Sequence, residues 1–166
     1  LNIQSNIFSR TGLNHIFWAM RQNKRLRILR CGFNQAGTKF CSNNDSLLRH
    51  GISVPKFIQS NVVLRELDLS FNTMCSEAGI NIMDAIIDNH TIKKLSLRGN
   101  LFDDSLAAML GDLLRCNNVL EELDIGKNKL GFSCVFAIAE SLEINRSLKR
   151  LYIDYNHFGG AGTATL

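Results

Sequence analysis

Residues 64–72 read LRELDLSFN, and this stretch decides the fold. It fits the template L-x-x-L-x-L-x-x-N, and four other stretches fit it once isoleucine and cysteine are accepted at apolar positions. The final asparagines of those stretches are Asn34, Asn100, Asn128 and Asn156, and a partial copy ends at Asn6. Successive asparagines lie 28, 38, 28, 28 and 28 residues apart. Self-similarity at a nearly constant spacing predicts an array of one structural unit.

A second asparagine precedes each complete block by three residues, at Asn23, Asn61, Asn89, Asn117 and Asn145. Two registers that agree over five blocks indicate a true repeat rather than a chance pattern. The asparagine that ends each block follows a strand, where the chain has to turn. Its side chain carries donors and an acceptor, so we expect stacked copies to satisfy the backbone groups of the turns as a ladder.

The alternating apolar positions of the template predict a short strand, because successive side chains of a strand point to opposite faces. Residues after the asparagine have helical spacing, as at Leu106, Leu110 and Leu113. Each unit is therefore one strand and one helix. Every unit runs in the same direction, so the strands must be parallel. Stacked units predict an α/β solenoid with strands on the concave face and helices on the convex face.

These blocks resemble leucine-rich repeats of the ribonuclease-inhibitor-like subclass. The resemblance rests on the template itself, on the 28-residue unit and on its long helical half. It implies a horseshoe arc, and it places the chain among families that include ribonuclease inhibitor, tropomodulin and the Ran GTPase-activating protein. Most such arrays bind other proteins, so the resemblance implies a role in protein–protein interaction.

The domain prediction is one array over residues 1–166, with about five and a half repeats. The single step of 38 residues predicts an insertion within residues 35–53. This insertion is either a partner-specific loop or a tolerated surface lengthening, because long loops often bind partners but cost little free energy. Both ends of the chain lack the caps that solenoids use, so we expect a fragment of a longer array.

A partner is expected on the concave face, where the variable strand positions project outward. Three aromatic residues, Phe33, Phe71 and Tyr155, share the template position just before the asparagine. Exposed aromatics flanked by arginine and aspartate are typical interface anchors, although they could instead cover the edge of the turn. The predicted partner-binding residues are Arg30, Phe33, Asp68, Phe71, Arg98, Asp124, Lys127, Tyr152, Asp154 and Tyr155.

Charge favours a protein partner over nucleic acid. The formal net charge of the chain is only +4. The expected strand surface carries nine basic and six acidic residues, and the two signs are interspersed. Binding to a phosphate backbone would favour a more uniform basic face, whereas a mixed face suits protein recognition. The basic residues are Arg27, Arg30, Arg65, Lys93, Lys94, Arg98, Lys127, Lys149 and Arg150, and the acidic ones are Glu66, Asp68, Glu121, Glu122, Asp124 and Asp154.

Composition and motifs give no sign of an enzyme, a cofactor, a metal site or a small-molecule substrate. The sequence contains none of the common nucleotide-binding, serine-hydrolase or zinc-protease motifs. It also has no apolar run of about 20 residues, so no membrane segment is expected. The five cysteines form no C-x-x-C pair, and their odd number favours a reduced, cytoplasmic chain.

The function predicted from the sequence is a non-enzymatic interaction scaffold, such as a subunit of a cytoskeletal or axonemal complex. One alternative is a GTPase-activating protein similar to the Ran activator, in which Arg10 would stabilise developing charge during phosphoryl transfer. A second alternative is an inhibitor similar to ribonuclease inhibitor. That family is acidic and rich in tryptophan and cysteine, whereas this chain is mildly basic.

Overall fold

The computed structural model describes residues 1–35 and 54–159, except for the side chain of Arg10. Strands of three residues alternate along the chain with helices of seven to twelve residues. One short 3-10 helix, η2, precedes α4. The elements are α1 (Arg10–Met20), β1 (Ile28–Arg30), α2 (Val54–Ser60), β2 (Glu66–Asp68), α3 (Ser76–Ile87), β3 (Lys94–Ser96), η2 (Asp104–Leu106), α4 (Ala107–Cys116), β4 (Glu122–Asp124), α5 (Phe132–Leu142) and β5 (Arg150–Tyr152).

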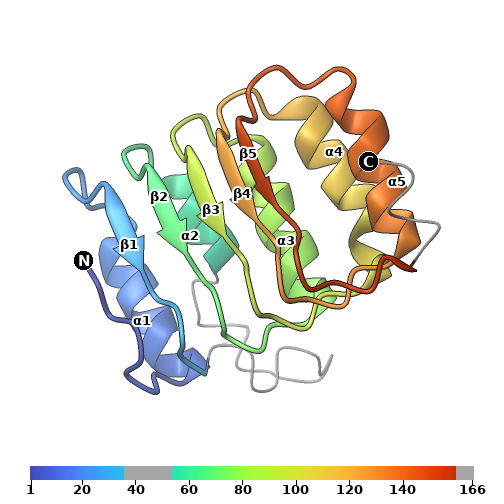
Figure 1. Cartoon of the computed structure of the whole chain (residues 1–166). Helices are drawn as coiled ribbons and strands as arrows, with labels where there is room; N and C mark the ends of the chain where they lie inside the picture. The colour runs from blue at the N-terminus through green and yellow to red at the C-terminus, as the bar shows by residue number, and fades with distance from the viewer. Residues whose placement is uncertain (36–53, 160–166) are drawn as a thin grey trace.

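The strands form one parallel sheet in the order β1-β2-β3-β4-β5, and the helices form a second layer along one face of it (Figure 1). The register pairs each central leucine with the next, from Leu29 through Leu67, Leu95 and Leu123 to Leu151. Paired residues are 38 positions apart between β1 and β2, and 28 apart in the later pairs. The predicted α/β solenoid with parallel strands is confirmed.

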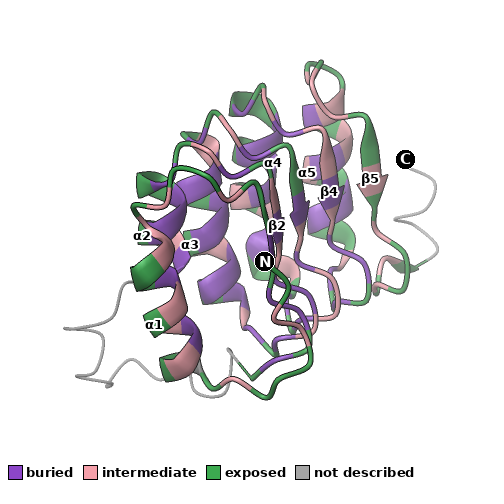
Figure 2. Ribbon diagram, turned by 90° about the vertical axis from the view of Figure 1, so that its left-hand side faces the viewer, coloured by how far each residue is buried: buried purple, intermediate pink, exposed green. Residues whose placement is uncertain are grey.

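The core lies between the sheet and the helices, as the buried layer in Figure 2 shows. Leu67 and Leu123, at the centres of their strands, are fully buried. On the helix side, Leu110 and Leu113 of α4 are also fully buried, which confirms the predicted apolar stripe. Leu151 on β5 is only half-buried, because β5 has a strand neighbour on one side alone in the described sheet.

The asparagine after each strand forms the predicted ladder, and Asn100 shows its geometry. Its side-chain oxygen accepts hydrogen bonds from the backbone N–H groups of Asn72 and Met74 in the preceding repeat, at 3.1 and 3.0 Å. Its amide nitrogen donates to the carbonyls of Leu69 and Leu97, at 3.2 and 2.8 Å. One buried side chain therefore satisfies four backbone groups and joins two repeats.

The second asparagine register shapes the turn from helix to strand. The side-chain oxygen of Asn89 accepts from the backbone N–H groups of Thr91 and Ile92, at 2.9 and 2.8 Å. Its amide nitrogen donates to the carbonyls of Ile58 and Asn61 in the preceding repeat, at 2.9 and 3.3 Å. Asparagine recurs at both turns because its side chain can bond backbone N–H and C=O groups of its own repeat and of the preceding repeat at once.

The cysteines differ from the expectation of a fully reduced chain. Cys31, Cys116 and Cys134 are free thiols, whereas Cys75 is disulfide-bonded. An odd number of cysteines therefore does not exclude a disulfide, since it requires only that at least one thiol stays unpaired.

Two further sequence predictions bear on the fold. Among the described residues, no helix is long and apolar enough to cross a membrane. The predicted insertion at 35–53 lies outside the described residues apart from Gln35, so its place on the surface stays a prediction.

Candidate functional site

The residue just before each ladder asparagine has left-handed backbone geometry. The φ angles are +54° at Phe33, +51° at Phe71, +66° at Gly99, +52° at Lys127 and +56° at Tyr155. Left-handed geometry is uncommon for residues other than glycine, and here the turn imposes it in five successive repeats. The shared backbone places these positions side by side along the C-terminal ends of the strands.

The side chains at this position form a row along the surface, which we call the aromatic row: Phe33, Lys127 and Tyr155, which are exposed, and Phe71, which is half-buried. The rings of Phe33 and Phe71 are stacked, with centroids 4.2 Å apart and planes 12° apart. The Nζ atom of Lys127 lies 5.9 Å from the centroid of Phe71 and 5.4 Å from that of Tyr155, within reach of a cation–π interaction. Phe33 and Tyr155 are 52% and 76% exposed, so the row is open to a partner.

Beside the aromatic row, Arg98 joins two aspartates from the next two repeats. Its Nη1 atom lies 3.2 Å from Oδ1 of Asp124 and 2.8 Å from Oδ1 of Asp154, and a second contact joins Nη2 to Asp154. The hydrogen bond from Arg98 lowers the pKa of Asp154 below its ordinary value. These three predicted site residues therefore form one cluster, in which a single guanidinium bridges two carboxylates and one negative charge is left over.

At the other end of the strands, carboxylates bridge cations of neighbouring repeats. Glu121 lies 2.5 Å from Lys93 and 2.7 Å from Lys149. Hydrogen bonds from Lys149 and then Lys93 lower the pKa of Glu121 to about 2. Glu122 is placed in the same way between Lys94 and Arg150, at 3.5 and 2.7 Å. Much of the mixed charge predicted for this face is thus paired within the protein.

The other predicted site residues lie apart from the aromatic row. Arg30 pairs with Glu66 at 2.8 Å, and Asp68 accepts a hydrogen bond from Gln4 at 2.7 Å. Arg30, Asp68 and Asp124 help to line a hollow of about 210 Å³ on the strand face. Tyr152 is 42% exposed on β5. The structure thus places nine of the ten predicted residues in an aromatic row, a charged cluster and the wall of a hollow, and Tyr152 lies outside these three groups.

The comparisons with known proteins concern both sequence and fold. A family model described as "Leucine Rich repeat" matches residues 60–83. A solved structure of "Leiomodin-1 Actin-Binding Site 2 (ABS2)" is similar with a TM-score of 0.64 and 19% sequence identity, and the match covers 91% of this chain and 83% of that chain. The chain folds as a leucine-rich-repeat solenoid. At 19% identity, this likeness establishes the fold alone. No curated protein matches the chain.

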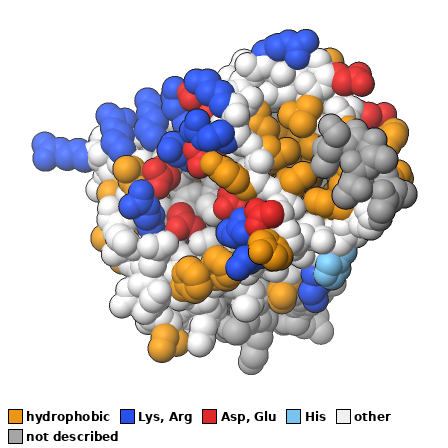
Figure 3. Space-filling model, in the orientation of Figure 1, with side chains coloured by type: hydrophobic (Ala, Val, Ile, Leu, Met, Phe, Trp, Pro, Cys, Tyr) orange, Lys and Arg blue, Asp and Glu red, His pale blue; other side chains and the backbone are white. Residues whose placement is uncertain are grey.

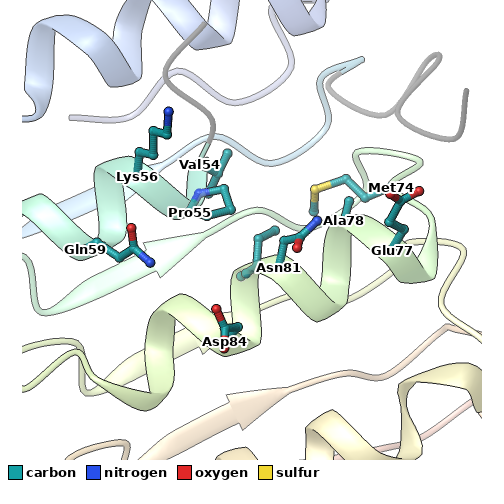
Figure 4. Close-up of a pocket in the computed structure, with 10 residues that line it drawn as sticks. Val54, Pro55, Lys56, Gln59, Met74, Glu77, Ala78, Asn81 and Asp84 are labelled. Carbon is teal, nitrogen blue, oxygen red and sulfur yellow. The ribbon is translucent and has the colours of Figure 1, made fainter. Parts of the chain in front are cut away.

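A larger hollow of this leucine-rich-repeat array lies between α2 and α3, on the helix side (Figure 4). Its volume is about 400 Å³, and its lining includes the buried residues Val54, Met74 and Ile82, with Lys56 and Asp84 nearer the surface. It adjoins Val54, the first residue described after position 53. No predicted site residue lines this hollow, and no periodic signal in the sequence indicated it.

Two further points concern metal binding and the residue proposed for GTPase activation. Within residues 1–35 and 54–159, no group of three or more histidine, cysteine, aspartate or glutamate side chains could hold a metal ion. Arg10, the candidate of the GTPase-activator alternative, begins α1, but its side chain lies outside the described part. That assignment therefore stays a prediction.

Among the five left-handed positions that precede Asn34, Asn72, Asn100, Asn128 and Asn156, Gly99 is the one that the sequence analysis did not single out. Its missing side chain leaves the space in which the ring of Phe71 lies, and a methyl group built at Gly99 would overlap that ring. The sequence does contain a signal for it, because Gly99 occupies the template position that Phe71 and Tyr155 occupy in other repeats.

Proposed function

We propose that this leucine-rich-repeat array is a non-enzymatic protein-interaction module whose partner contacts the concave face and the aromatic row. The observation that carries this proposal is the stacking of Phe33 on Phe71, in line with Lys127 and Tyr155, on an open surface. Large aromatic side chains dominate the binding energy of many interfaces, and a single row of them offers a partner several anchors.

The backbone supports this role because it holds the row in place before any partner arrives. Each side chain of the row is attached to a turn that the asparagine ladder fixes, as the contacts of Asn72 and Asn128 illustrate. Anchors that are already ordered lose little conformational entropy on binding. A covering role for the turn does not explain Tyr155, which is 76% exposed.

The cluster of Arg98, Asp124 and Asp154 would supply specificity beside these apolar anchors. One guanidinium faces two carboxylates in it, so the cluster keeps one net negative charge, and a partner with donor groups placed for these carboxylates is favoured by both charge and hydrogen-bond geometry. Arg30, Asp68 and Tyr152 extend the proposed contact surface across the strand face. We further propose that the segment 35–53 makes a second contact with the partner. We also propose that residues 1–166 form one repeat array.

A cytoskeletal partner is the first candidate to test, because the similar solved structure is described as an actin-binding site. Co-sedimentation with actin filaments and binding to monomeric actin test that candidate. Neither the GTPase-activator nor the ribonuclease-inhibitor alternative is favoured by the comparisons. A cytoplasmic location is also part of the proposal. The disulfide at Cys75 counts against it, because disulfides are rare in the reducing cytosol.

The experiment that tests the proposal is a quantitative capture of partners from a cell extract with three versions of the protein. The first is unchanged, and the second carries Phe33→Ala, Phe71→Ala and Tyr155→Ala. The third is a matched control, in which three aromatics that are 47–48% exposed on α1 and α5 are replaced: Trp18→Ala, Phe132→Ala and Phe136→Ala. Partners retained by the control but lost by the second version support the proposal. Partners retained by all three contradict it.

A further inference from the structure

The loops that lead into the strands carry a concentration of positive charge, which we call the basic rim. It consists of segments 23–28, 61–66, 89–94, 117–122 and 145–150, which lie at one edge of the sheet. Figure 3 shows lysine and arginine side chains gathered along the same edge, above the strands of Figure 1. All the cations of the rim are exposed: Lys24, Arg25, Arg27, Arg65, Lys93, Lys94, Arg146, Lys149 and Arg150.

These nine cations face three carboxylates in the same segments, Glu66, Glu121 and Glu122. The net charge of the rim is therefore 9 − 3 = +6, which is larger than the +4 of the whole chain. The remainder of the protein is accordingly net negative. Each of the three carboxylates is half-buried and already bonded to cations, as Glu121 is to Lys93 and Lys149. An ammonium group has three donors, so these lysines keep donors for an external acceptor.

Four arginines of the rim, Arg25, Arg27, Arg65 and Arg146, have no carboxylate partner among the described residues, and two of them are held by a carbonyl of the next repeat. The Nη1 atom of Arg27 donates to the carbonyl of Val63, and that of Arg65 donates to the carbonyl of Thr91, both at 3.0 Å. Each guanidinium group is thereby held against the loop of the next repeat. A guanidinium has five donors, and the planar fork suits bidentate binding of a carboxylate.

We propose that the basic rim binds an acidic polypeptide segment of a partner protein, in extended form and across the strands. Five neighbouring loops at a strand spacing of about 4.8 Å span about 19 Å. An extended chain that rises about 3.3 Å per residue crosses that distance with about six residues. A short segment rich in glutamate or aspartate is therefore long enough to meet cations from every repeat that carries them.

The geometry favours a polypeptide over single-stranded nucleic acid. Proteins that bind single strands place stacking aromatics next to a groove that follows the phosphates. In this protein the aromatic row lies at the C-terminal ends of the strands and the basic rim at their N-terminal ends. The strand face between them carries the paired charges of Arg98, Asp124 and Asp154, so no uniform cationic track joins the two.

The test measures binding of a fluorescent glutamate peptide of about ten residues, long enough to exceed the rim. One variant carries Arg27→Gln and Arg65→Gln. A second carries Lys24→Gln and Arg25→Gln, whose side chains have no hydrogen bond or ion pair in the described part, so its fold is not at risk. The control removes two exposed cations elsewhere, by Lys56→Gln and Lys129→Gln.

We expect each rim variant to weaken peptide binding at least about fivefold and the control at most about twofold, with binding by the unchanged protein lost as salt rises from ~0.05 to ~0.5 M. Absent binding by the unchanged protein, or equal losses in rim and control variants, overturns the inference. The inference is also overturned if a thymidine oligonucleotide binds more tightly than the glutamate peptide and the rim variants weaken that binding. The variant of Phe33, Phe71 and Tyr155 should bind the peptide normally, so the two proposals can fail separately.

Discussion

The ring of Phe71 lies over the backbone of Gly99, so closely that a methyl group on Gly99 would overlap it. The two residues occupy the same template position in successive repeats. A side chain at 99 would therefore compete with Phe71 for one place in the aromatic row. The glycine lets Phe71 lie flat between its own repeat and the next, within 5.9 Å of Lys127.

Replacing Gly99 with alanine is expected to destabilise the protein by about 1–3 kcal/mol. Its φ of +66° accounts for about 1 kcal/mol, because alanine is disfavoured in the left-handed region. The remainder comes from displacement of the Phe71 ring, which is comparable to overpacking. Chemical denaturation measures the change in the free energy of unfolding.

Gly159→Ala is the matched control for this prediction. Gly159 has the same φ of +66°, but a methyl group there meets no atom within 4 Å. Its substitution should therefore show the backbone cost alone. An equal loss of stability at both positions would mean that the contact between Phe71 and Gly99 has no energetic weight.

The asparagine ladder predicts a larger loss at Asn100, which is only 4% exposed. Asn100→Ala would leave two N–H groups and two carbonyls without their side-chain partner. Each buried unsatisfied group costs about 1–3 kcal/mol, so we expect a loss of at least about 3 kcal/mol in denaturation experiments. Asn156→Ala should cost less, since Asn156 is half-buried and satisfies three such groups. If both variants keep full stability, the ladder is not what holds the turns.

Asp104 caps a helix of the neighbouring repeat. Its carboxylate accepts hydrogen bonds from the backbone N–H groups of Gly131, Ser133 and Cys134 at the start of α5, at 2.9, 3.0 and 3.0 Å. The helix has no side-chain cap of its own. Partial burial alone would raise the pKa of Asp104, but the hydrogen bonds from Cys134 and Ser133 outweigh it and hold that pKa below its ordinary value.

The stabilisation by Asp104 should therefore depend on pH. Because its folded-state pKa lies below the unfolded value of about 3.9, the contribution is complete above that value and is lost as pH falls through the folded-state pKa. At neutral pH, Asp104→Asn should cost about 1 kcal/mol, as for the loss of a charged cap. The difference between the two proteins, measured by urea denaturation from pH 7 to about pH 2, should shrink only at the acid end. If the difference in the free energy of unfolding does not change with pH, the charged cap is contradicted. The control is Asp112→Asn, which removes a carboxylate from an exposed ion pair.

The fold could be predicted from the sequence because the same strand-and-turn pattern occurs in five complete copies. Leucines such as Leu67 and Leu95 mark the buried centre of each strand, and the asparagines mark both turns. Contacts between repeats with no periodic signature could not be predicted. The bond from Asp104 to α5 occurs at one junction, and the hollow beside Val54 depends on the helix that follows the irregular step.

The candidate site was predictable only as a set of positions. The shared template position of Phe33, Phe71 and Tyr155 could be found from the sequence, and the structure shows that the first two rings stack. The pairing of Arg98 with Asp154 could not be found, because it joins residues 56 positions apart through side-chain conformations. For the same reason, a count of strand charges did not show that most of them pair with one another.

The most direct test of the central claim is the dissociation constant of a captured partner, measured with purified proteins by calorimetry. Phe33→Ala, Phe71→Ala and Tyr155→Ala together should weaken binding by about tenfold or more, while the free energy of unfolding falls by no more than about 2 kcal/mol. The control variant of Trp18, Phe132 and Phe136 should bind within about twofold of the unchanged protein. Unchanged affinity in the first variant, with the fold intact, would contradict the claim that the aromatic row is the binding surface.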